Sequence, residues 1–302
     1  MNHSELNSQP NDINLSDLIS VILNYKKFIF SVCFLSSILV LIYAFTIPNY
    51  YQSTSVLEVE KAYSERSSGG SSGLETLTQL TGVSMSGSNN MGNLAEATIR
   101  SFDFLNHLIL KDETFLPKLL AVKEFDPTTN EIIYDNTIYN PDTRTWVDQR
   151  PSYIKAHKIF IKNLSLNISR KSNFATLSYK HISPIIAAEF VDLIYTEANS
   201  IIRKRDMDEA EASLAYLYSQ LENVNQKEVL ASVNALIASE LRKLTLANIK
   251  KNYLLDPIDR PFIPEQKYSP SRLIILITGF FASLAISIFF ITIWHFGIKN
   301  KF

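Results

Sequence analysis

Hydrophobic positions are unevenly distributed along this chain, and the two longest apolar runs lie near its ends. The first extends from Phe28 to Ile47 and the second from Leu273 to Phe296, and neither contains Asp, Glu, Lys or Arg. A helix needs about 20 mostly apolar residues to cross about 30 Å of hydrocarbon, so both runs predict transmembrane helices. A cleaved signal peptide is the competing interpretation of the first run, but that run starts only at residue 28, and Thr46-Ile47-Pro48 is a poor cleavage site.

Basic residues beside the two runs predict their orientation. Lys26 and Lys27 precede the first run, and Lys299 and Lys301 follow the second. Because cytoplasmic loops carry an excess of Lys and Arg, we expect both chain ends in the cytoplasm, with Arg272 as a minor contrary signal. The long middle region then forms a folded extracytoplasmic domain. The short segment after the second run leaves no room for a kinase module, which argues against a sensor kinase.

The region after the first run mixes strand and helix patterns. Apolar and polar residues alternate in the segments that we expect to be strands, and apolar residues recur at helical spacing elsewhere. The expected strands are Tyr50–Lys61, Leu164–Ser169 and Ala175–Tyr179, and the expected helices are Leu74–Leu80, Leu94–Leu110, Thr114–Leu120 and Tyr153–Asn163. Residues 125–150 predict a hairpin or a surface excursion. The glycine-rich stretch 64–73 lacks the spacing of a phosphate-binding loop, so we interpret it as a plain loop.

A long helical region follows. No proline or glycine occurs between Pro184 and Leu254, and apolar residues recur at helical intervals apart from an interruption at 223–226. We therefore expect a helical hairpin, whose first arm would be about 60 Å long at about 1.5 Å per residue. Arg203, Lys204 and Arg205 form a basic patch in that arm. The patch could bind an anionic sugar or a neighbouring subunit, or it could be a solvated face with an ion pair between Arg205 and Glu209.

Two smaller features lie next to and within the second run. Pro257, Pro261, Pro264 and Pro270 exclude a helix and favour an extended, polyproline-like strut, which is either a semi-rigid spacer at the membrane or an ordinary linker. Within the second run, Gly279 and Ser283 form a small-xxx-small pair of the kind that lets membrane helices approach closely.

The remaining features of the sequence indicate no nucleic-acid, metal or catalytic site. The net charge of −1 argues against nucleic-acid binding, which usually needs a basic excess. The single cysteine, Cys33, cannot form an internal disulfide, and the five histidines show no metal-ligand spacing. We therefore expect no enzyme activity, no metal and no cofactor.

Three stretches of the sequence resemble the Wzz-type chain-length determinants, which are polysaccharide co-polymerases. They are NDINLSDLISVILNYKKFIF, PNYYQSTSVLEV and the segment from Ala235 to Phe281, ALIASELRKLTLANIKKNYLLDPIDRPFIPEQKYSPSRLIILITGFF. The resemblance places the family's strut motif on Pro261, Pro264, Ser269 and Pro270 and its helix-packing motif on Gly279. Relatives often have a second glycine where this chain has Ser283.

The resemblance implies an α+β membrane protein of the bacterial inner membrane, in which two transmembrane helices flank a periplasmic mixed α/β domain with a long protruding helical hairpin. It also implies a non-enzymatic homo-oligomer that regulates the chain length of O-antigen or a related polysaccharide. The implied partner is a membrane polymerase, with a lipid-linked glycan as a further candidate and Gly279 and Ser283 as the candidate contact. An alternative role is an export adaptor for exopolysaccharide or capsule that works with a separate tyrosine kinase and an outer-membrane channel. A scaffold or sensor unrelated to glycans is a third class.

The expected organisation is a cytoplasmic segment 1–27, a membrane helix 28–47, a periplasmic membrane-proximal α/β domain 48–183, a helical hairpin 184–254, a proline-rich strut 255–272, a second membrane helix 273–296 and a cytoplasmic tail 297–302.

Overall fold

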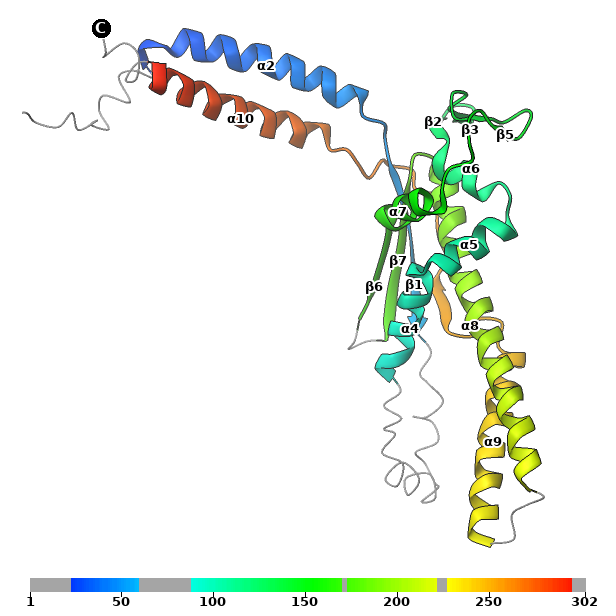
Figure 1. The fold of residues 1–302 in the computed structure, drawn as a ribbon. Helices are drawn as coiled ribbons and strands as arrows, with labels where there is room; N and C mark the ends of the chain where they lie inside the picture. Colours follow the sequence, from blue (N-terminus) through cyan, green and yellow to red (C-terminus); the bar gives the residue numbers. More distant parts are fainter. Residues whose placement is uncertain (1–22, 60–87, 170–172, 222–226, 295–302) are drawn as a thin grey trace, which may run out of the picture. The chain divides into compact units, whose positions relative to one another are not determined.

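A computed structural model describes residues 23–59, 88–169, 173–221 and 227–294 of the 302-residue chain (Figure 1). The chain divides into unit 1, which comprises residues 1–49 and 268–302, and unit 2, which comprises residues 50–267. Each unit has its own cluster of buried hydrophobic residues. The expected helix at Leu74–Leu80, the glycine-rich loop and the interruption at 223–226 lie outside the described residues.

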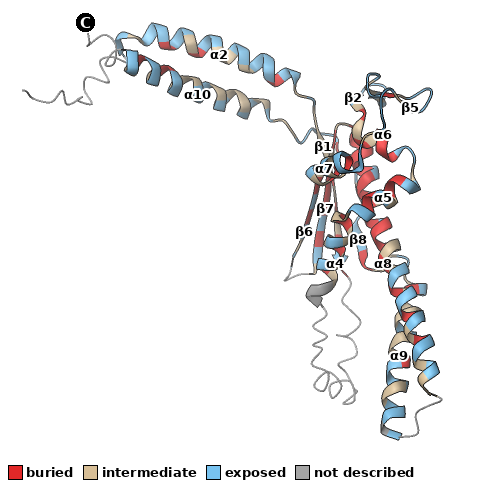
Figure 2. Ribbon diagram, viewed as in Figure 1, coloured by how far each residue is buried: buried red, intermediate tan, exposed pale blue. Residues whose placement is uncertain are grey.

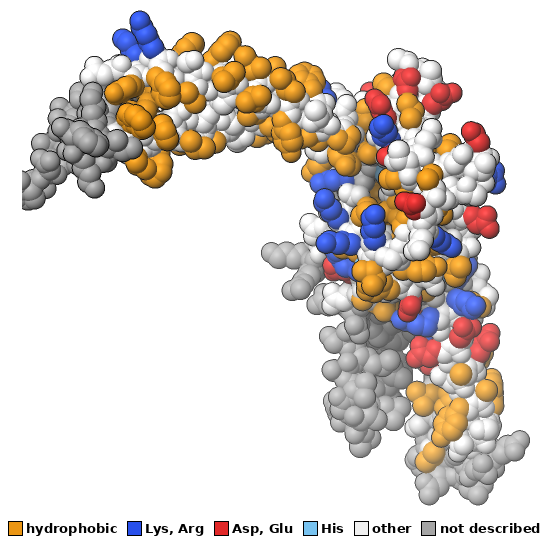
Figure 3. Space-filling model, turned by 45° about the horizontal axis from the view of Figure 1, so that its top comes forward, with side chains coloured by type: hydrophobic (Ala, Val, Ile, Leu, Met, Phe, Trp, Pro, Cys, Tyr) orange, Lys and Arg blue, Asp and Glu red, His pale blue; other side chains and the backbone are white. Residues whose placement is uncertain are grey.

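The described residues of unit 1 include two long helices that pack against each other, α2 (Lys26–Thr46) and α10 (Arg272–Thr292). Both coincide with the predicted membrane runs and are long and apolar enough to cross a bilayer. Only 17% of the most apolar window of α2 and 11% of that of α10 are buried, so neither is the core helix of a soluble domain. Figure 3 shows hydrophobic side chains over the visible surface of the pair. A lipid environment would accommodate this exposed apolar surface.

Unit 2 is built on a four-stranded antiparallel sheet with the strand order β6-β7-β1-β8. The strands are β1 (Tyr51–Val59), β6 (Leu164–Ile168), β7 (Phe174–His181) and β8 (Leu255–Asp259). The three strands expected from alternation are confirmed. The fourth, β8, comes from the proline-rich segment and pairs with the second half of β1, from Val59 opposite Leu255 to Val56 opposite Asp259. The start of the predicted strut is therefore an edge strand of the sheet, a position that tolerates Pro257.

Alternation along β1 sets the face of the sheet that is buried. Ser53, Ser55, Leu57 and Val59 are buried, while the residues between them are more exposed. Successive side chains of a strand point to opposite faces, so this pattern places one face against the core. An aromatic cluster fills that core. Its members are Phe115, Phe160, Tyr179 and Phe190, with ring centroids 4.5 to 6.3 Å apart.

Before the long hairpin, the described residues of unit 2 also form four short helices: α4 (Ser88–Arg100), α5 (Phe102–Lys111), α6 (Phe115–Leu120) and α7 (Tyr153–Asn163). The single helix expected at Leu94–Leu110 is wrong, because the chain breaks at Ser101. The backbone of Ser101 is extended, and its hydroxyl accepts a hydrogen bond from the Phe104 amide. A serine in this conformation caps a new helix rather than continuing the previous one.

The region 125–150 forms two hairpins. One joins β2 (Val122–Asp126) to β3 (Glu131–Tyr134), and the other joins β4 (Tyr139–Asn140) to β5 (Thr145–Trp146). Asn130 and Arg144 adopt positive φ angles of 56° and 54° in the two turns. The expected hairpin is thus confirmed, and a second hairpin follows it in the chain.

The long helical hairpin is present as α8 (Pro184–Leu221) and α9 (Lys227–Ile249). The N-terminal half of α8 packs against β1 and β7, whereas its C-terminal half packs against α9. Buried positions are dense up to Ile202 and then continue only as Asp206, Ala210 and Leu214. Figure 2 shows the same change, from buried residues to a largely exposed pair of helices. We call residues 203–221 and 227–249 the helical arm.

Candidate functional site

Gly279 of α10 packs directly against Val40 of α2. A Cβ atom on Gly279 would lie 2.8 Å from both Cγ atoms of Val40. Real Cβ atoms do not approach other atoms so closely, so only glycine permits this packing distance. The small-residue pair predicted in the sequence therefore faces a helix of the same chain. Ser283 follows one turn later and is half-buried.

A third small residue, Ser287, extends the same line and escaped the sequence analysis. It is buried, and its hydroxyl donates a hydrogen bond of 2.7 Å to the Ser283 carbonyl. The Ser283 hydroxyl likewise donates to the Phe280 carbonyl at 2.8 Å. Both hydroxyl donors are satisfied within α10 and need no water, as a membrane interior requires. The spacing of four residues between Ser283 and Ser287 is the sequence signal that could have revealed Ser287.

The first residue of α10, Arg272, contacts the segment at the end of α2. Its guanidinium donates to the Asn49 side chain at 3.2 Å and lies over the Phe45 ring, 4.7 Å from the centroid. An arginine in this position combines a hydrogen bond with a cation–π contact. The residue that appeared as a contrary charge in the sequence thus joins the ends of the two helices.

The proline-rich segment is held against β1 by two buried serines. Ser53 Oγ donates to the Phe262 carbonyl at 2.7 Å, and Ser55 Oγ donates to the Asp259 carbonyl at 2.5 Å. Of the predicted strut residues, Pro257 lies in β8, Pro261 is half-buried and Pro264 is buried. Ser269 and Pro270 are joined by a cis peptide bond and precede α10. Residues 257–267 therefore follow the edge of unit 2 and form no helix, as the prolines predict.

The basic patch Arg203, Lys204 and Arg205 lies on α8 just beyond the sheet, and its last two members are exposed. The expected ion pair between Arg205 and Glu209 is wrong. Arg205 pairs with Asp206 at 3.2 Å, and Glu209 pairs with Lys243 of α9 at 3.1 Å. The helix spacing allowed the predicted pair, but the antiparallel α9 supplies a partner that the sequence alone does not reveal.

Asp206 connects the arm to the segment after α9. It is buried, and it accepts a hydrogen bond of 3.0 Å from the Tyr253 hydroxyl in addition to the contact with Arg205. Burial and the neighbouring Asp206 carboxylate raise the pKa of Tyr253 above its ordinary value, so this hydroxyl remains a donor.

Two buried polar residues of α8 lie one turn before the arm, and periodicity did not single them out. Glu197 accepts hydrogen bonds from His107 at 2.7 Å and from Lys111 at 2.5 Å, both on α5. Burial opposes the charge on Glu197, but these hydrogen bonds outweigh burial and lower its pKa. Asn199 donates to the Leu255 carbonyl at 2.7 Å and accepts from the amides of Leu254 and Leu255 at 2.8 Å each. Asn199 thus fixes the start of β8 to α8.

His181 is buried at the end of β7. Its Nδ1 accepts a hydrogen bond from the Ser183 amide at 3.0 Å, so Nε2 carries the proton and donates to the Lys118 carbonyl at 2.9 Å. Burial lowers the pKa of His181 to about 4, and the side chain is neutral near pH 7. Across the described ranges, no group of three or more His, Cys, Asp or Glu residues is placed to hold a metal ion.

Comparison with known proteins identifies one family. Residues 11–111 match the family model of Wzz, described as chain length determinant protein. No curated protein matches the chain. The matched segment contains α2, β1, α4 and α5.

Two solved structures are similar to this chain at low identity. A full-length bacterial polysaccharide co-polymerase aligns with 95% of this chain and 99% of its own, at a TM-score of 0.41 and 12% identity. A fragment of WzzB, a polysaccharide co-polymerase from Salmonella Typhimurium, aligns with 73% of this chain and 100% of its own, at a TM-score of 0.29 and 13% identity. Both TM-scores are below 0.5, so neither structure supports an argument about this chain. The similarity of residues 11–111 to the Wzz family model agrees with the resemblance seen in the sequence.

Proposed function

We propose that this chain regulates the length of a bacterial surface polysaccharide, O-antigen in the first instance, as a non-enzymatic partner of a membrane polymerase. The observation that carries the proposal is the Wzz match over residues 11–111, which includes the first membrane helix and β1, one of the two central strands of the sheet in unit 2. In this proposal α2 and α10 anchor the chain in the inner membrane, and unit 2 lies in the periplasm. The basic residues Lys26 and Lys27 before α2 support this orientation.

The helical arm supports assembly with further copies of the chain. Large apolar side chains are exposed along it. They are Tyr216, Tyr218, Leu236, Leu241 and Ile249. An accumulation of exposed large apolar side chains on one element is typical of interaction sites in soluble proteins. A neighbouring copy that covers this surface would give the homo-oligomer that we propose. Arg203, Lys204 and Arg205 at the base of the arm are candidate subunit or glycan contacts in the same assembly.

The polymerase would meet the membrane helices around Gly279 and Ser283. Because Gly279 already packs on Val40 of the same chain, we expect it to act by fixing the distance between α2 and α10. The polymerase would then contact the outer surface that this packing creates. The proline-rich segment, with Pro257, Pro261, Pro264, Ser269 and Pro270, would serve as the connection between the outer domain and α10.

The test is the glycan length profile of a deletion strain on a gel. We expect the clustered distribution of the parent strain to become broad and weighted to short chains, and the intact gene to restore it. An unchanged profile would contradict the proposal. Loss of exported capsule or exopolysaccharide with a normal O-antigen profile would instead support an export adaptor.

The arm can be tested separately with a pair of matched variants. Leu241→Gln changes an apolar residue on the arm, and Leu110→Gln changes an exposed apolar residue of α5. We expect the first variant to reduce chemical cross-linking between copies and to broaden the glycan profile. The second should leave both unchanged. Equal effects of the two variants would argue against assembly through the arm.

A further inference from the structure

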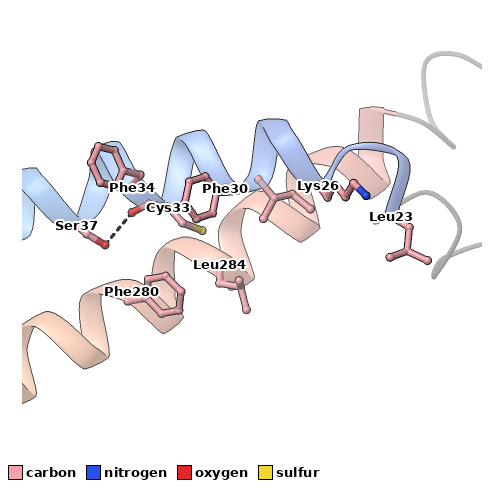
Figure 4. A pocket seen from close by; sticks show the side chains of 9 residues that line it. Leu23, Lys26, Phe30, Cys33, Phe34, Ser37, Phe280 and Leu284 are labelled. Atoms are coloured by element: carbon pink, nitrogen blue, oxygen red, sulfur yellow. Dashed lines mark hydrogen bonds between the residues drawn. The ribbon is translucent and has the colours of Figure 1, made fainter.

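A groove of about 360 Å³ lies between α2 and α10 near the start of α2 (Figure 4). This volume is within the range of about 300 to 1,000 Å³ that is usual for ligand pockets. It exists because Cys33 and Ser37 are small and lie one turn apart on α2, while the bulky side chains of Phe30, Phe280 and Leu284 line the groove beside them. Apart from Leu23, which precedes α2, all the residues that line the groove belong to the two membrane helices.

The lining of this groove is apolar except at its end. Ser37 Oγ donates to the Cys33 carbonyl at 2.7 Å, so its proton is satisfied within α2. Lys26 also lines the groove, at the end where α2 begins, and it carries the one charged side chain among the lining residues. Within the described part of the chain no carboxylate forms a salt bridge with Lys26, and the first turn of α2 contains no acidic residue. The charge of Lys26 therefore lacks a counterion from these residues.

An apolar groove that ends at a lysine with no salt bridge to the described residues matches one kind of membrane component. An acyl chain fills hydrocarbon-lined space, and a phosphate supplies a negative charge that complements the ammonium of Lys26. Lysine side chains near helix ends reach toward the head-group region, and basic pockets between membrane helices bind anionic head groups. We propose that this groove holds one acyl chain of an anionic phospholipid and that Lys26 binds its phosphate. The inference depends on the membrane placement of α2 and α10 and not on chain-length control.

The test measures the phospholipid retained by the full-length protein. The protein is reconstituted in nanodiscs of equal parts phosphatidylglycerol and phosphatidylcholine, released into mild detergent and analysed by native mass spectrometry. We expect the unmodified protein to retain phosphatidylglycerol preferentially. Lys26→Gln should reduce that preference about tenfold, since the loss of one direct hydrogen bond between charged groups corresponds to at least about this factor in affinity. Lys27→Gln is the matched control, because Lys27 is adjacent but does not line the groove, and it should keep the preference.

A second pair of variants tests the groove itself. Cys33→Phe and Ser37→Phe fill the space without changing charge, and we expect both to lose retention of either phospholipid. Equal retention of the two phospholipids by the unmodified protein, or an unchanged preference in Lys26→Gln, would overturn the proposal. A protein subunit in place of the lipid would also overturn it. Glycan length profiles of the same variants keep the two proposals separate, because lost lipid with a normal profile contradicts only this one.

Discussion

Asn199 offers the sharpest test of how unit 2 is held together. Its side chain is 3% exposed and makes three hydrogen bonds of 2.7 to 2.8 Å to the backbone of Leu254 and Leu255. Both leucines are buried as well. Asn199→Ala would leave two N–H groups and one carbonyl without these partners. Since an unsatisfied buried polar group costs about 1 to 3 kcal/mol, the variant should lose at least about 3 kcal/mol.

Asn199→Ala should change both the Tm of the protein and the rate of hydrogen exchange in β8. For a domain of this size, 1 kcal/mol corresponds to about 2 to 4 °C in Tm, so we expect a decrease of at least about 6 °C. Tryptophan fluorescence of the full-length protein in detergent can follow it, because Trp146 lies in β5 of unit 2. Hydrogen exchange should also accelerate in β8, whose first residue Asn199 holds.

Asn248→Ala is the matched control. Asn248 is exposed and donates only to the Leu244 carbonyl of its own helix, at 3.0 Å. Surface substitutions of this kind usually change stability by less than about 0.5 kcal/mol, so the Tm should move by no more than about 2 °C. If Asn199→Ala shifts the Tm no further than this control, the reasoning about buried polar partners in unit 2 is refuted.

Three further predictions concern packing and pH. Gly279→Leu drives a side chain into Val40, so it should broaden the glycan length profile, and a second change, Val40→Ala, should restore part of it; no restoration would indicate that Gly279 contacts another protein. His181 has a folded pKa of about 4 against an ordinary 6.5, so its contribution of about 3 kcal/mol is complete above pH 6.5 and is lost as the pH falls toward 4. His181→Gln should flatten the decrease in Tm across that range, and an unchanged slope would contradict the assignment. Glu197 has a lowered pKa, so its contribution is present above its unfolded value and is lost as the pH falls through the folded one; Glu197→Gln should lower the Tm at pH 7 and reduce its dependence on pH below about 4.5.

The sequence predicted those elements whose pattern is local. Helix α7 has the bounds that its periodicity indicated. The first membrane helix begins at Lys26 instead of Phe28, and the second begins at Arg272 instead of Leu273. The long hairpin follows from the absence of proline and glycine after Pro184. These features depend on neighbouring residues, which a single sequence displays directly.

The features that the sequence did not reveal depend on distant partners. The prolines at 257, 261, 264 and 270 predict an extended strut and no helix, but the place of β8 at the sheet edge follows only from its pairing with β1. Glu197 and Asn199 interrupt no pattern, and their partners lie far away in the sequence. Glu209 likewise pairs with Lys243, which is distant in the sequence, and not with the expected Arg205. Ser101 is different, since a serine followed by Phe102 and Asp103 was a local signal for a new helix.

Chain-length control as proposed requires unit 2 to lie outside the cytoplasm while α2 begins inside it. The most direct measurement is labelling with a membrane-impermeant maleimide in spheroplasts, after Cys33→Ala removes the single native cysteine. Glu131→Cys, on exposed β3, should be labelled in intact spheroplasts, and Leu23→Cys, just before α2, only after lysis. Labelling of the Glu131 position only after lysis would contradict the proposed placement and, with it, the proposed function.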